Sequence, residues 1–156
     1  MSYSLAKVVH VVAVVLWIGP PLGAYYLLVQ AHRGRDPARI VWAERHCERV
    51  LIAEHVAFLV LVVSGLLMLY SVDWTLLEQG WMRAKLHLVA LVVLFEAFDM
   101  WLAHVVFRKL LATDAEVGSP PWRKASRMRL VLAGAGMLIV VVILPAIFWF
   151  AVAKPA

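Results

Sequence analysis

The sequence is poor in cysteine and in charged residues. It contains one cysteine, Cys47, so a disulfide bond within the chain is excluded. Only 16% of the 156 residues are charged, whereas 64% are hydrophobic, and the mean hydropathy is +0.86. A soluble helical bundle shows a polar stripe along each helix, and Val8–Ile18 and Val131–Ile143 show none. The composition therefore argues against a soluble bundle and indicates an integral membrane protein.

Four stretches are long enough to cross a bilayer. A membrane-spanning helix needs about 20 mostly apolar residues. The predicted helices cover about residues 5–30, 50–70, 81–111 and 130–152. They use most of the chain and leave no room for a separate soluble domain. We therefore predict one domain over residues 1–156, an all-α integral membrane protein with a four-transmembrane-helix bundle.

The basic residues concentrate in two of the predicted connections. Arginine and lysine gather in Ala31–Arg49 and Lys109–Arg129, whereas Ser71–Gly80 contains neither. The positive-inside rule then places the two basic connections in the cytoplasm. Both termini are predicted outside, in the periplasm, for a multi-pass protein of the bacterial inner (plasma) membrane. The net charge of +5 thus suits the headgroups of the lipid bilayer, and we predict no nucleic acid partner.

Several local features modify this plan. We expect Pro20 and Pro21 to kink the first helix and Pro145 to bend the last one. The first basic connection is expected to contain a short interfacial helix, with Cys47 in a charged loop. The small residues Ala133–Gly136 allow close helix contact and hence a homodimer.

Ionisable side chains lie inside the predicted spans. Hydrocarbon is a poor solvent for them, so such residues face the bundle interior and mark functional sites. By depth, His10, Lys85 and His87 share the outer level of the bundle, and His55 and His104 share the inner level. The carboxyl groups in these spans are Glu54, Glu96 and Asp99.

Histidine pairs on facing helices suit haem iron. By depth we pair His10 with His87, and His55 with His104, so that the bundle would hold one b-type haem or two. The same four histidines would also accept copper or zinc.

Two stripes line the expected site. Trp17 lies on the stripe of His10, beside the cofactor. Lys85, Glu96 and Asp99 form the other stripe. We expect Lys85 to contact a carboxylate of haem or substrate, and the two acids to transfer protons. The competing interpretation of each membrane histidine is an interhelical hydrogen bond.

Two short motifs resemble a known group. Lys7-x-x-His10 opens the first span and is followed by Trp17-Ile18-Gly19, and Gly80-Trp81-x-x-x-Lys85-Leu86 opens the third. This pattern resembles the small haem-containing protoporphyrinogen IX oxidases of bacteria (the HemJ type) and the related copper-resistance D (CopD-like) membrane domain. The resemblance implies that His10 binds b-type haem and acts together with Lys85. It also implies a porphyrin substrate and electron transfer toward the respiratory chain.

Three functional hypotheses follow. The leading one is a haem-containing redox protein that transfers electrons to quinone or acts as an oxidoreductase on a small molecule such as protoporphyrinogen IX. The second is transport of copper or another metal, as in the CopD type. The third is a non-catalytic subunit of a larger respiratory membrane complex.

Overall fold

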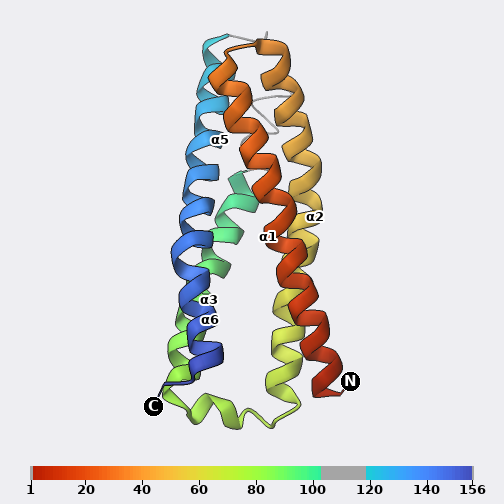
Figure 1. The fold of residues 1–156 in the computed structure, drawn as a ribbon, viewed down its shortest axis with the longest axis vertical. Helices are drawn as coiled ribbons and strands as arrows, with labels where there is room; N and C mark the ends of the chain where they lie inside the picture. Colours follow the sequence, from red (N-terminus) through yellow and green to blue (C-terminus); the bar gives the residue numbers. More distant parts are fainter. Residues whose placement is uncertain (1, 103–118, 156) are drawn as a thin grey trace.

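The computed structural model describes residues 2–102 and 119–155, and all their regular structure is helical (Figure 1). The elements in chain order are α1 (Tyr3–Gly34), α2 (Pro37–Tyr70), the short 3-10 helix η1 (Thr75–Glu78), α3 (Gly80–Trp101), α5 (Pro120–Leu138), the π-helical turn η3 (Ile139–Ile143) and α6 (Leu144–Ala153). The prediction of an all-α protein is confirmed for this part of the chain.

The helices form an elongated bundle. Helices α1 and α2 run antiparallel side by side, and α5, η3 and α6 form one long rod against which α3 packs (Figure 1). Both chain ends and η1 lie at one end of the bundle. The turn between α1 and α2 and the start of α5 lie at the other, which we call the basic end.

Three helical segments are long and apolar enough to span a membrane. They are α1, α2 and the combined rod Pro120–Ala153, so the membrane prediction is confirmed at this level. Helix α3 is a fourth, more polar helix beside them, since Arg83, Lys85, Glu96 and Asp99 lie on it.

The predicted bounds of the connection Ala31–Arg49 are wrong, and the short helix expected within it is the first part of α2. Helix α1 ends at Gly34, and α2 begins only three residues later. Asp36 caps α2 by accepting a hydrogen bond from the backbone N–H of Ala38 at 3.0 Å, and Pro37 suits the first helical turn. The charged stretch is helical because its apolar residues recur at helical spacing and are buried against α1, namely Ile40, Ala43 and Cys47.

The end of the second predicted basic connection is helical as well. Ser119 caps α5, which starts with Pro120, so the last ten residues of the predicted loop Lys109–Arg129 are helical.

Helix α2 is 34 residues long, about 50 Å at 1.5 Å per residue. The hydrocarbon core is only about 30 Å thick, so the basic end has the length to extend beyond it.

The prolines act differently from one another. Helix α1 continues through Pro20 and Pro21. Before Pro145, by contrast, the helix widens into the π turn η3. A proline ring clashes with the carbonyl of the residue four positions earlier, and a π turn is one way for a helix to relieve such a conflict.

Candidate functional site

Three carboxyl groups line one cavity between the helices. Glu54 from α2 and Glu96 and Asp99 from α3 line one cavity, together with Trp17 and Tyr25 from α1. Its volume is about 30 Å³, which is room for about two water molecules. No lysine, arginine or histidine lines this cavity among the described residues.

The two glutamates of the cavity are deeply buried. Glu54 is 7% exposed and Glu96 is 6% exposed. The indole Nε1–H of Trp17 donates to Oε1 of Glu96 at 3.2 Å. The Oε2 atom of Glu54 is buried and has no hydrogen-bond partner within the described part of the chain. One acid is therefore oriented by an indole, and the other presents an unpaired oxygen inside the bundle.

Helical spacing brings these side chains together. The buried face of α1 includes Ala13, Trp17 and Ala24, and that of α3 includes Val92 and Glu96, one turn apart. The small residues on α1 let α2 approach closely. Trp17 then packs on Phe58 of α2, with ring centroids 5.3 Å apart.

His10 lies in a separate contact between α1 and α2. Its Nδ1 is 3.0 Å from the carbonyl oxygen of Leu61 and 3.1 Å from the hydroxyl of Ser64. A carbonyl only accepts, so Nδ1 carries the hydrogen, and Nε2 of the neutral ring carries a lone pair. Gly65 leaves space for the ring, because a Cβ there would lie 3.2 Å from Cε1 of His10.

The other predicted ligands are dispersed. His87 is exposed, and His55 is buried on α2 beside Glu54. His104 lies outside the described residues. Neither His10 nor His87 lines the central cavity. Lys85 is half-buried.

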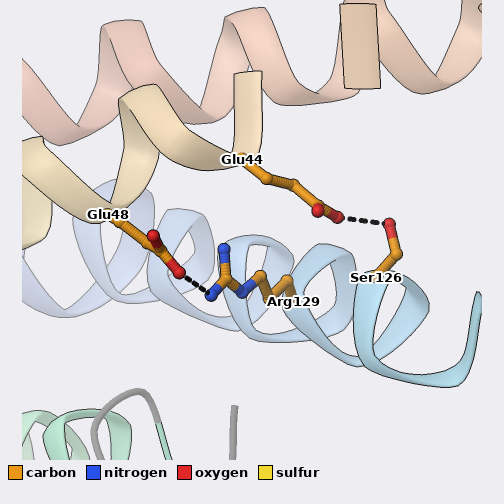
Figure 2. Close-up of polar contacts among 4 residues, drawn as sticks. All are labelled: Glu44, Glu48, Ser126 and Arg129. Carbon is orange, nitrogen blue, oxygen red and sulfur yellow. Dashed lines mark hydrogen bonds and ion pairs between the residues drawn. The ribbon is translucent and has the colours of Figure 1, made fainter. Parts of the chain in front are cut away.

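A second cavity of about 30 Å³ adjoins the first and shares Tyr25 and Asp99 with it. Cys47 and Arg129 line its other side. Arg129 forms an ion pair with Glu48 at 2.7 Å (Figure 2). Cys47 is 3% exposed and donates to the carbonyl oxygen of Ala24 at 3.3 Å, so its predicted place in a charged loop is wrong.

A protein-family model matches nearly the whole chain. Residues 4–155 match DUF2269, a family described as predicted integral membrane proteins. The chain belongs to this family. No curated protein and no solved structure matches it. The match supports the membrane assignment, and it does not extend to the haem-containing oxidases or the copper-resistance domain suggested by the motifs.

Sequence reasoning missed part of the polar interior of this DUF2269 protein. Glu44, Glu48, Arg129 and His32 were expected in loops or left unassigned, and Tyr25 was given no role. The missed signal is the spacing Ile40, Ala43, Glu44, Cys47, which is that of a buried helical face.

Hydrogen bonds also connect α1, α2 and α5 near the basic end. The hydroxyl of Ser126 donates to Oε1 of Glu44 at 2.6 Å (Figure 2), and Nε2 of His32 is 2.7 Å from the same hydroxyl oxygen. These contacts link α1, α2 and α5.

Proposed function

We propose that this protein binds and transfers protons inside the membrane at the cavity lined by Glu54, Glu96 and Asp99. The observation that carries the proposal is the buried, unpaired Oε2 of Glu54 in the wall of a cavity large enough for water. An ionised carboxylate is costly to bury without partners. A bound proton removes the charge, and aspartate and glutamate in membrane spans form proton relays elsewhere.

The arrangement also supports transfer between the acids. Glu54 and Glu96 come from different helices and line the same small cavity. Two or three negative charges there would repel one another, so the cluster is suited to retaining protons and passing them on through water. The indole of Trp17 keeps Oε1 of Glu96 as an acceptor.

The test is infrared spectroscopy of the protein in lipid vesicles during a change of pH. We expect the carbonyl band of protonated carboxyl groups at neutral pH, reduced in Glu54→Gln and Glu96→Gln. Glu78→Gln is the matched control, because Glu78 is exposed in η1. A band unaffected by both cavity variants would exclude the proposal.

A b-type haem redox protein is the second candidate, and His10 favours it. Histidines that bind metals commonly donate their other ring N–H to a carbonyl, as Nδ1 of His10 does to Leu61. If haem binds, His10 would hold its iron, Lys85 would pair with a propionate, and the haem would supply one-electron chemistry. Ligand pockets measure about 300–1,000 Å³, so the central cavity of about 30 Å³ does not fit haem.

This candidate is tested by the reduced-minus-oxidised optical spectrum of protein purified from haem-supplemented cells. We expect a sharp α-band that is lost in His10→Ala. His46→Ala is the control, because His46 stacks on Trp42 near the basic end. A flat spectrum from the unaltered protein would exclude haem.

Metal transport has weaker support, since no group of three or more His, Cys, Asp or Glu among the described residues is arranged to hold a metal ion.

The proton function requires a defined orientation. We propose that α3 is a fourth span, that the basic end faces the cytoplasm and that both termini face the periplasm of the bacterial inner membrane. The support is the concentration of arginine at one end of the bundle, opposite both termini (Figure 1).

A further inference from the structure

His32, Ser126 and Glu44 form a chain of two short hydrogen bonds. The distances determine how many hydrogens the three side chains must share. Nε2 of His32 is 2.7 Å from Oγ of Ser126, and Oγ of Ser126 is 2.6 Å from Oε1 of Glu44. Each gap must contain a hydrogen, because two lone pairs at such distances repel. The serine hydroxyl supplies only one of the two.

The second hydrogen must therefore come from one of the other two groups. Nδ1 of His32 is 2.9 Å from the carbonyl oxygen of Leu28, which only accepts, so Nδ1 already carries a hydrogen. Nε2 then either carries another, as an imidazolium facing the carboxylate of Glu44, or accepts from Ser126 while a protonated Glu44 donates to Ser126. These distances fit a cluster that holds one hydrogen more than a neutral imidazole, a hydroxyl and a carboxylate together.

These two states differ only in the positions of hydrogens. In one step, the Nε2 hydrogen of His32 passes to Oγ of Ser126, and the hydroxyl hydrogen of Ser126 passes to Oε1 of Glu44. One N–H bond breaks, one O–H bond forms on Glu44, and the serine hydroxyl is regenerated. The total charge is unchanged, so the three residues can conduct a proton.

The location of this relay connects water with the interior. His32 is half-exposed in the last turn of α1, where the helix dipole favours a cation. Glu44 and Ser126 are buried, at 6% and 4% exposed. The relay thus runs from the surface of the basic end inward.

The next polar contact lies one helical turn deeper on both helices. Glu48 follows Glu44 on α2 and Arg129 follows Ser126 on α5, and the two contacts are seen together in Figure 2. Arg129 and Asp99 both line the second cavity, which has room for about two waters. Asp99 then belongs to the central cavity as well. Polar residues thus lie at intervals from His32 to the three carboxyl groups, with one helical turn between the relay and the pair of Glu48 and Arg129.

The other charged groups near the relay, among the described residues, are either paired, stacked on a ring or exposed. Glu48 and Arg129 pair with each other, and His46 stacks on Trp42. Asp36, just before α2, pairs with Arg39. The remaining charges within about one turn are exposed, namely Arg33, Arg35, Arg45, Arg123, Lys124 and Arg127.

We infer that His32, Ser126 and Glu44 are the port through which the central cavity exchanges protons with the aqueous phase at the basic end. This inference rests on the proposed proton function of the cavity. Water and hydronium are the only ligands it requires.

The test is the rate at which the infrared carboxyl band changes after a rapid pH jump. Positioned proton transfer accelerates a step by about 10²–10⁴-fold, so we expect Ser126→Ala to slow the change by about a hundredfold with the same final amplitude. Ser126→Thr keeps a hydroxyl and should restore most of the rate. Ser71→Ala, at an exposed serine of the other end, should have no effect.

The outcomes separate the two proposals. A Ser126→Ala protein as fast as the unaltered one would overturn the port and leave the cavity function intact. An unaltered protein without any carboxyl response would overturn both. Nitrogen NMR of His32, assigned with His32→Gln, is the second measurement and needs no altered serine: Nδ1 must carry hydrogen, and an Nδ1 without it would also overturn the port.

Discussion

At the residue scale, polar side chains of the interior are held by partners from other helices. Trp17 of α1 meets Glu96 of α3, and His10 of α1 meets Ser64 of α2. Each contact crosses more than 50 residues of sequence. The cost of a buried polar group without a partner explains why these few side chains occur in pairs, and why the unpaired oxygen of Glu54 points to a function.

We expect Trp17→Phe to destabilise the protein. The substitution keeps an aromatic ring but removes the donor to Oε1 of Glu96, and leaving a buried acceptor unsatisfied costs about 1–3 kcal/mol. The measurement is the unfolding free energy in detergent. Trp149→Phe is the control, because Trp149 is 64% exposed. Equal effects of the two variants would contradict the role of this hydrogen bond.

Two glycine substitutions should act in different ways. A Cβ at Gly65 would press on the ring of His10 at 3.2 Å, whereas a Cβ at Gly23 would have nothing within 4 Å. We expect Gly65→Ala to displace the His10 ring, seen as a shift of its imidazole NMR signals. Gly23→Ala should leave those signals unchanged and stabilise α1 by about 0.5–1 kcal/mol. An unshifted His10 in Gly65→Ala would show that the ring has room to spare.

At the element scale, caps and packing decide where the helices begin. The boundary between α1 and α2 consists of Arg35, in the left-handed conformation with φ 55°, and the capping residue Asp36. This short turn sets α1 and α2 antiparallel over nearly their full length. It thereby brings Glu44 beside the end of α1, where the proposed port lies.

Loss of the Asp36 cap should weaken the start of α2. We expect Asp36→Ala to cost about 1 kcal/mol, whereas Asp36→Asn keeps a capping oxygen and should be close to neutral. The ion pair of Asp36 with Arg39 is exposed, and such pairs contribute little. Thermal unfolding and amide hydrogen exchange over Ala38–Ile40 measure the effect. Equal losses in both variants would assign the stability to the charge instead of the cap.

At the scale of the whole molecule, charge is distributed along the bundle axis. Most exposed arginines lie near the turn between α1 and α2 and at the start of α5, opposite both termini, whereas Arg83 lies on α3 next to η1 (Figure 1). With the proposed orientation, the port opens to the cytoplasm, and the end containing η1, Lys85 and His10 faces the periplasm.

Cysteine accessibility tests this orientation. In a bacterial host we expect a membrane-impermeant maleimide to label Glu78→Cys in intact spheroplasts, and Arg39→Cys only after permeabilisation. The native chain is its own control, because its one cysteine, Cys47, is 3% exposed and should stay unlabelled. The reverse pattern would invert the topology and assign the port to the periplasm.

The sequence by itself determined that the chain is helical and embedded in a membrane, because run length and hydropathy are local properties of each segment. It also indicated the ionisable residues of the spans and the inward stripe of Glu96 and Asp99. Only the tertiary structure decided which of them meet. A helix shows its burial only against its neighbours, so the charged start of α2 was taken for a separate short helix at the membrane interface. Contacts such as Ser126 with Glu44 join residues 82 positions apart, and their register depends on the packing of three helices.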